Sequence, residues 1–424
     1  MNRNPKGCNN IGGQIAANME YCRGAAMHLF SLYGYHPFSP AEFQLVEDVW
    51  SKIAPARARR LIPLMSPLGE PCVMRGDLTL SAVAYLASHH ARNERPLRLS
   101  YADRVFAVPQ PPKNNLEENQ VGVELIGWED TGADAETAAL LMRTLDLLSI
   151  ERSALVLGDV SVLSAIFRGL PARGAAELIE ALQERAYTKY NTILAELELP
   201  EKKARLLGRL LSLKGDVSVI GEAMGLLAAD ASACEGDEAA GAGRGLPASL
   251  DGPGALLPLK RLCDSLCKLG YAERLRVDLS FVRDLGYYSG PIYNAYSSVD
   301  GVLLGGGGRY DGLLAKEGIE GQAAGFALNL KELAAHCASP APAPLMMLWG
   351  GASGNAEALR YADALSRKNT AFELSWTKNR EESLSTASLR GYKWWIDLGG
   401  RRVTQLPGGR EISLNEFESE VLSC

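Results

Sequence analysis

The sequence predicts an α+β protein with more than one domain. Short segments rich in β-branched and aromatic residues, typical of strands, occur between about 70 and 127 and again from about 275. A stretch rich in Leu, Ala, Glu and Lys at helical spacing separates them, from about 153 to 228. A proline–alanine segment at 339–344 marks a domain boundary. At 424 residues, the chain is too long for one ordinary core.

The N-terminal part begins with an amphipathic helix. Residues 13–33 place Ile15, Met19, Cys22, Ala26 and Leu29 on one stripe. After an extended segment containing Pro37 and Pro40, the pattern predicts three strands and then a helix: 71–75, 104–108 and 121–127, followed by 134–148.

The segment after 153 is predicted to be a helical insertion rather than part of a sheet. Ala231–Pro253, made largely of Ala, Gly, Asp and Ser, is expected to be a flexible loop, so the insertion and its loop span 153–253. Strands resume at 274–281, 291–298 and 301–306. Turns are expected at Gly286, at Asp300-Gly301 and at the glycine run Gly305–Gly308.

Composition excludes several classes of function. The net charge of −6 gives no basic footprint for nucleic acid. The start of the chain has no signal-peptide pattern and no run of about eighteen apolar residues exists, so we expect a cytoplasmic protein without a membrane span. Eight cysteines form no CxxC pair. Cys263 and Cys267 are interpreted as buried thiols, and His89-His90 is not spaced to share a helix face, so no metal and no cofactor are expected.

Six motifs then occur in one order. They read YGYHPFSP, MRGDLT, QVGVELIG with ADAE, RDLGYYSGPIYNAY, GGGRYDGL and AAGFALNLKEL, and they begin at Tyr33, Met74, Gln120, Arg283, Gly306 and Ala323. Together they resemble the histidine–tRNA ligase branch of class II aminoacyl-tRNA synthetases. The resemblance is closer to a paralogous family, the regulatory subunits of ATP phosphoribosyltransferase.

This resemblance implies a class II synthetase-like core over 1–338 and a small α/β domain over 345–424. The core would hold a mixed, mostly antiparallel sheet of six or seven strands flanked by helices, with MRGDLT in a strand. The C-terminal domain would be similar to a shortened anticodon-binding domain. Its ten Lys/Arg and ten Asp/Glu balance, so tRNA binding is not expected. Trp394-Trp395 is interpreted as core rather than as a base-stacking surface.

By resemblance, seven residues form a histidine pocket: Asp77, Thr79, Gln120, Glu124, Arg283, Tyr288 and Tyr310. Their chemistry suits that ligand, since carboxylates accept ammonium or imidazole N–H groups and arginine holds a carboxylate. Gly286 stands where the family's G-L-D-Y-Y has its acid. An alternative is a hydrogen-bonded core without a ligand. The glycine run also resembles a phosphate loop, yet no Lys-Ser or Lys-Thr follows and no helix start is signalled, so close backbone approach is favoured.

The family's two ATP-clamping arginines are missing. Ala107 follows Val105-Phe106 where motif 2 has one arginine, and Glu332 replaces that of motif 3. Each such charge-assisted contact contributes about 1.5–3 kcal/mol. Arg104 is an alternative source of charge, although it is expected on the opposite strand face. The loop Pro109–Asn119 carries a single cation, Lys113.

The implied function is that of a non-catalytic regulatory subunit in histidine biosynthesis. Such a subunit would join a short-form catalytic subunit of ATP phosphoribosyltransferase in a hetero-octamer, self-associate as a homodimer, and take part in feedback by histidine. Two alternatives stay open. One is an active histidine–tRNA ligase, against which Ala107 and Glu332 stand. The other is a stand-alone histidine sensor, which would not assemble with the transferase.

Overall fold

The computed structural model describes residues 4–420 except 54, 90–95, 110–113, 129–131, 232–251, 284–287, 339–345 and 352–354. It divides into two compact units, Met1–Ala338 and Ser339–Cys424. Most of the predicted flexible loop, the proline–alanine linker, Gly286 and Lys113 lie outside the described residues.

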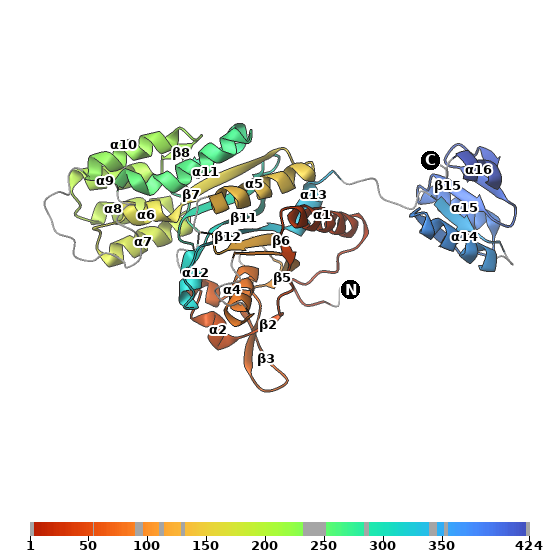
Figure 1. Cartoon of the computed structure of the whole chain (residues 1–424), viewed down its shortest axis with the longest axis horizontal. Coiled ribbons are helices and arrows are strands. Elements are labelled where there is room, and N and C mark those ends of the chain that lie inside the picture. Colours follow the sequence, from red (N-terminus) through yellow and green to blue (C-terminus); the bar gives the residue numbers. More distant parts are fainter. Residues whose placement is uncertain are drawn as a thin grey trace. The chain divides into compact units, whose positions relative to one another are not determined.

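A mixed, mostly antiparallel sheet forms the framework of the first unit (Figure 1). Within the described residues it has nine strands, in the order β1-β5-β6-β12-β11-β10-β7-β9-β8. Only the β1–β5 and β7–β9 pairs of these strands are parallel. In that order the strands are His36–Pro37, Leu97–Phe106, Glu117–Ile126, Ala323–Asn329, Leu303–Arg309, Pro291–Ser297, Ser153–Asp159, Leu275–Asp278 and Lys214–Gly215. The prediction of six or seven strands was too low because β1 and β8 have two residues each, too few to leave a pattern.

One face of this sheet is covered by helices. They include α1 (Gly13–Leu32), α5 (Gly132–Leu147), α11 (Leu257–Lys268) and α13 (Leu330–His336). The alternation of β6 explains the arrangement, since its odd-numbered residues 121, 123 and 125 are buried in the main core with these helices. The predicted stripe on α1 is confirmed by its buried residues Cys22, Ala26 and Leu29.

The other face of the sheet meets a smaller layer, which has its own hydrophobic cluster. It contains a three-stranded sheet of order β2-β4-β3, namely Phe43–Leu45, Pro71–Met74 and Ile62–Met65. It also contains α2 (Val46–Trp50), α3 (Pro55–Ala58), α4 (Leu78–His89) and α12 (Asp311–Lys316). The prediction of a strand through MRGDLT was wrong beyond Met74, because β4 ends there and α4 begins at Leu78 and includes Thr79.

The helical insertion begins later than predicted. It consists of α6 (Val160–Ile166), α7 (Ala172–Gln183), α8 (Tyr187–Glu196), α9 (Glu201–Leu210) and α10 (Val219–Ala231), and two 3₁₀ turns follow at Gly252–Leu256 and Ala272–Arg274. Residues 153–159 form β7, which pairs with β9 and β10 inside the sheet. A short run of apolar residues has no polar–apolar alternation to separate a strand from a buried helix, which explains the error.

The glycine run is also placed differently from the prediction. Gly305–Gly308 lies inside β11, paired with β10 and β12, rather than in a turn.

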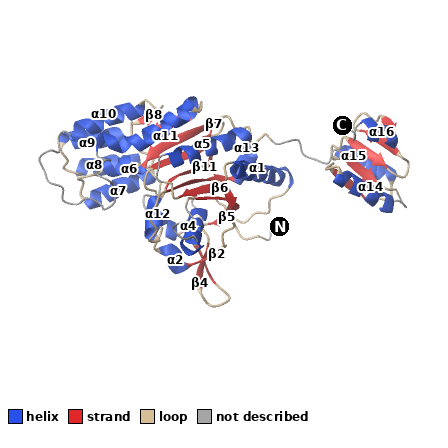
Figure 2. Cartoon of the chain, viewed as in Figure 1, coloured by secondary structure: helices blue, strands red, loops and turns tan. Residues whose placement is uncertain are grey.

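The second unit is an α/β domain with a five-stranded sheet among its described residues (Figure 2). Its order is β14-β13-β15-β16-β17, with strands Phe372–Ser375, Met346–Trp349, Trp394–Asp397, Arg402–Gln405 and Glu411–Ser413. Its helices are α14 (Asn355–Arg367), α15 (Arg380–Leu389) and α16 (Leu414–Glu420). Trp395 is fully buried and stacks on Trp349 at 5.9 Å between ring centroids, while Trp394 packs on Phe417 at 5.1 Å. Both tryptophans therefore belong to the core, as predicted. Across the described residues, no helix combines the length and apolar character needed to span a membrane.

Candidate functional site

Residues from distant parts of the first unit meet in one cavity of about 510 Å³. We call it the amino-acid pocket. Six of the seven predicted histidine ligands line it, namely Asp77, Thr79, Gln120, Arg283, Tyr288 and Tyr310. The seventh, Glu124, lies beneath them on β6. Asp77 and Thr79 come from the start of α4, and Tyr310 directly follows β11, so the cavity lies between the large sheet and the smaller layer.

Glu124 is the buried acid of this pocket, with 1% of its surface exposed. Its carboxylate accepts hydrogen bonds from Thr79 Oγ1 at 2.6 Å, Tyr310 OH at 2.6 Å and Tyr101 OH at 3.1 Å. Burial raises the pKa of Glu124 to about 8, although these hydroxyl donors act in the opposite direction. At neutral pH this carboxyl is therefore largely in its neutral form, which can both donate and accept a hydrogen bond.

The floor of the pocket is bare main chain. A Cβ on Gly325 would lie 2.0 Å from Glu124 Oε2, and a Cβ on Gly306 would lie 2.3 Å from Asn294 Oδ1. Since such distances are too short for real Cβ atoms, these glycines are required for close approach. The paired strand is not a phosphate loop, although a helix does begin at Asp311, a start that the sequence did not signal.

Arg283 and Tyr288 form one wall. The guanidinium of Arg283 lies 5.1 Å from the ring centroid of Tyr288, and its Nη1 is 3.5 Å from the carbonyl oxygens of Tyr293 and Gly307. Burial raises the pKa of Tyr288, so its hydroxyl stays neutral. A neutral phenol beside a guanidinium offers hydrogen bonds to a ligand carboxylate.

Asp77, at the edge of the pocket, accepts hydrogen bonds from the backbone of α4 and from Arg57. Its Oδ1 accepts from the backbone N–H of Leu80 at 2.9 Å, which stabilises the first turn of α4. Its Oδ2 accepts from Arg57 Nη2, and Arg57 itself lines the cavity together with Arg60. Sequence analysis missed both arginines, because the four-residue α3 that precedes Arg60 carries no motif.

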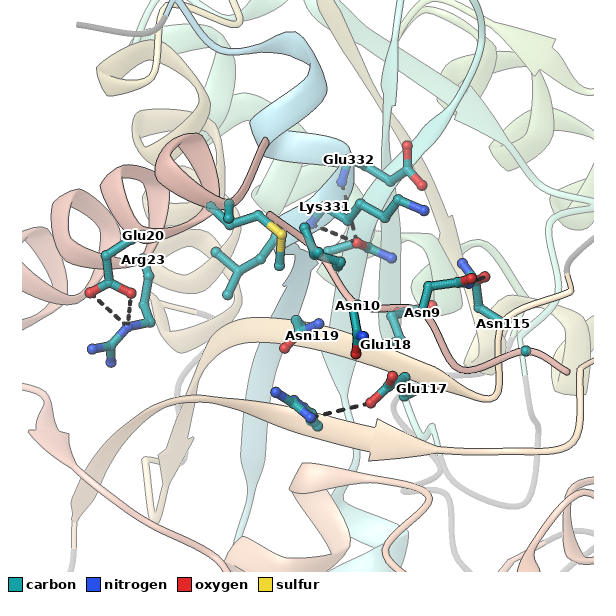
Figure 3. A pocket seen from close by; sticks show the side chains of 17 residues that line it. Asn9, Asn10, Glu20, Arg23, Asn115, Glu117, Glu118, Asn119, Lys331 and Glu332 are labelled. Carbon is teal, nitrogen blue, oxygen red and sulfur yellow. Dashed lines mark hydrogen bonds and ion pairs between the residues drawn. The ribbon is translucent and has the colours of Figure 1, made fainter. Parts of the chain in front are cut away.

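The two positions that lack clamp arginines lie outside this cavity. Ala107 is half-buried, and its N–H donates to Leu116 O at 2.9 Å, next to the β5–β6 hairpin. Glu332, in the first turn of α13, lines a second cavity of about 540 Å³ between α1, α13 and β6 (Figure 3). We call this the α1–α13 cavity. Arg104 lines this cavity together with Glu332 and pairs with Glu117 at 3.3 Å, and it does not line the amino-acid pocket.

The α1–α13 cavity is not a cationic site. Its described lining includes the four acids Glu20, Glu117, Glu118 and Glu332 and the three bases Arg23, Arg104 and Lys331. Two of the bases are paired locally, Arg23 with Glu20 at 3.0 Å and Arg104 with Glu117 at 3.3 Å, as the dashed lines in Figure 3 show. The described lining therefore carries one more acid than bases and has no net positive charge to attract a phosphate chain.

The described residues contain no group of three His, Cys, Asp or Glu side chains placed to hold a metal ion. Cys263 is buried and Cys267 is partly buried, and both are free thiols.

A family model and curated relatives both match most of this chain. The family model described as histidyl-tRNA synthetase matches residues 7–240 and 233–333. An ATP phosphoribosyltransferase regulatory subunit of Moorella thermoacetica is 29% identical, over 92% of this chain and 97% of its own length. The subunit of the same name from Shouchella clausii is 31% identical, over 72% of this chain and 73% of its own length.

Solved structures show the same fold. A structure described as an ATP phosphoribosyltransferase regulatory subunit/histidyl-tRNA synthetase from Bacillus halodurans aligns with a TM-score of 0.77 at 24% identity, covering 91% of this chain and 96% of that one. A histidyl-tRNA synthetase from a Nostoc species aligns with a TM-score of 0.79 at 16% identity, covering 99% of both chains. Because the family model covers most of the first unit and a relative of this name is 31% identical over 72% of the chain, the chain belongs to the family of ATP phosphoribosyltransferase regulatory subunits.

Proposed function

We propose that this protein is a non-catalytic regulatory subunit of ATP phosphoribosyltransferase and takes part in feedback by histidine on the first step of histidine biosynthesis. The observation that carries the proposal is a contrast within one fold. The amino-acid pocket keeps its buried acid, its hydroxyl donors and its arginine, whereas positions 107 and 332 offer no cation to a nucleotide. The names of the relatives support the same role.

The binding free energy lost with the two missing cations is large enough to prevent adenylation. Losing both charge-assisted contacts removes about 3–6 kcal/mol of nucleotide binding, on the usual contribution of each contact. At 1.4 kcal/mol per factor of ten, this corresponds to a loss of about 10²–10⁴ in affinity. Glu332 adds repulsion toward a triphosphate, because an acid replaces a base.

The ligand that fits the amino-acid pocket best is histidine. Thr79 and Tyr310 line the cavity with hydroxyl groups that Glu124 holds in place, and their oxygens can accept a hydrogen bond from an imidazole N–H. Asp77 can accept from the α-ammonium, and Arg283 can hold the α-carboxylate. The partner would be a short-form catalytic subunit, with this chain as a homodimer inside a hetero-octamer in the cytoplasm.

Two measurements test this proposal. The purified chain is assayed for histidine-dependent ATP–pyrophosphate exchange, and it is mixed with a short-form catalytic transferase subunit to measure co-elution and transferase activity. We expect no exchange, together with co-elution and a gain of activity. Robust exchange would establish the histidine–tRNA ligase alternative, and absence of both exchange and co-elution would favour the stand-alone sensor.

Histidine binding is tested separately by calorimetry with a matched pair of variants. Thr79→Val removes the hydroxyl that donates to Glu124 at 2.6 Å. We expect histidine binding to weaken about tenfold, because the loss of one buried hydrogen bond changes a free energy by about 1–1.5 kcal/mol. Thr192→Val removes an exposed hydroxyl on α8 and is expected to leave the affinity unchanged. Equal affinities in the two variants would contradict the assignment.

A further inference from the structure

We propose that the mouth of the amino-acid pocket contains an anion subsite, formed by Arg57 and Arg60, that takes the phosphate group of a small molecule. The proposal deepens the function proposed above, since it adds a second ligand group to the same pocket. It stands on three features of the described residues: the balance of charge around the cavity, the position of Arg60, and the contact between the two arginines.

The charge balance of the cavity is positive. Its described lining contains the arginines Arg57, Arg60 and Arg283 and one carboxylate, Asp77. Glu124 lies below and is largely neutral, because burial raises its pKa to about 8. A zwitterionic amino acid brings no net charge, so it leaves this excess of positive charge in place. An anion bound beside the amino acid would neutralise it.

Arg60 is held next to the position where the family's motif 2 arginine is missing. Its Nε donates to Val108 O at 3.1 Å, and the N–H of Val108 donates back to Arg60 O at 2.7 Å. Val108 is the residue that follows Ala107, so a cation from the turn after α3 lies beside the end of β5. This contact uses one N–H of the guanidinium and leaves the fork of terminal nitrogens for an oxyanion.

The two arginines belong to a single turn and line the same cavity. The backbone N–H of Arg60 donates to Arg57 O at 2.9 Å, and both side chains are half-buried. Burial lowers the pKa of Arg60, and the charge of Arg57 lowers it further, while Glu118 acts in the opposite direction. Two half-buried guanidinium groups at one cavity mouth are stabilised when an anion binds between them.

Such a site differs from a catalytic nucleotide clamp. Only residues of the smaller layer would hold the phosphate. The second clamp position gives no cation from the other side, because it is the acid Glu332 and lies in the α1–α13 cavity. The arrangement suits recognition of a phosphate-bearing metabolite rather than its conversion.

The test is calorimetric titration of the full chain with inorganic phosphate. We expect the wild type to bind and Arg60→Gln to weaken binding at least about tenfold, the usual scale for one charge-assisted contact. Arg104→Gln is the matched control, because Arg104 lies on the opposite face and pairs with Glu117 at 3.3 Å, and it is expected to change nothing. Arg60→Lys keeps the charge without the fork and should lie between the two. The far-UV spectrum and the urea midpoint show that each variant folds.

Two further arms sharpen the result. Phosphate affinity is measured again with excess histidine, and an unchanged or tighter value supports adjacent subsites. AMP is titrated beside phosphate, and an Arg60-dependent advantage for AMP identifies a nucleotide as the source of the group, whereas equal affinity identifies free phosphate.

Three outcomes would overturn the subsite: no phosphate binding by the wild type, equal weakening by Arg60→Gln and Arg104→Gln, or displacement of phosphate by histidine. None of them depends on assembly with a transferase, so failure here and failure of the proposed function can be told apart.

Discussion

Glu124 makes the stability of the first unit depend on pH in a direction opposite to that of most carboxylates. Its pKa is raised by burial from an ordinary value near 4.5 to about 8. Between these two values the folded chain holds a proton that the unfolded chain has lost, so stability is fully present below about pH 4.5 and is lost as pH rises toward 8. The loss between pH 5 and pH 8 is on the order of 3 kcal/mol, from 1.36 kcal/mol per unit of pKa difference.

The perturbation is Glu124→Gln, which keeps the shape and removes the titration. Urea unfolding followed by circular dichroism at several pH values from 5 to 8.5 gives the free energy of unfolding of both proteins. We expect the difference between wild type and variant to move by about 3 kcal/mol in favour of the variant as pH rises. Glu177→Gln, at a side chain that is 40% exposed, is the control and should give a constant difference. Parallel pH profiles for wild type and Glu124→Gln would refute the reasoning.

Three other predictions concern the glycine floor of the amino-acid pocket, a buried ion pair and the missing ATP-clamping arginines. Gly325→Ala places a Cβ 2.0 Å from a buried carboxylate oxygen and should lower the free energy of unfolding by at least about 3 kcal/mol. Gly24→Ala, which adds its Cβ in open space on helix α1, should raise it by about 0.5–1 kcal/mol. Urea midpoints that shift in the same direction in both variants would contradict this prediction. Arg309→Ala leaves a buried aspartate without its bidentate partner at 2.7 Å and should cost about 3–5 kcal/mol of stability. Arg173→Ala, whose side chain is 90% exposed, is the control and should leave the free energy of unfolding unchanged, so equal values for the two variants would count against the prediction. Glu332→Arg alone should not restore ATP binding by calorimetry, because position 107 still lacks its cation, so micromolar affinity in that variant would argue against the clamp account.

The sequence predicted the elements that have a clear period or a motif. The α1 stripe, the strand at 121–127 and the two-unit organisation are of this kind, since each leaves a pattern of apolar residues or a change in composition. The motif resemblance brought the pocket residues together from segments that are more than two hundred positions apart, between Asp77 and Tyr310.

The misses have physical causes. Strand β7 is apolar without interruption from Ala154 to Leu157, so its sequence shows no alternation of polar and apolar residues, and its composition matched that of the helices that follow. The glycine run was predicted as a turn because glycine is common in turns, whereas it lies inside β11. Its other predicted role, close approach of the backbone, agrees with the structure, because a Cβ at these positions would collide with β10 or β12. Arg57 and Arg60 reach the cavity only through tertiary packing, for which the local sequence has no signal.

The main-chain floor also limits how the specificity of this pocket can change. Side chains at Gly306 and Gly325 would collide with Asn294 and Glu124, so mutation cannot reshape the bottom of the cavity without rebuilding two strands. Variation that retunes the preferred metabolite must therefore occur at the rim, in the short loops and helices of the smaller layer. Engineering libraries aimed at a new effector should leave β11 and β12 constant and diversify the turn after α3, where exchange of one residue alters charge without disturbing the sheet.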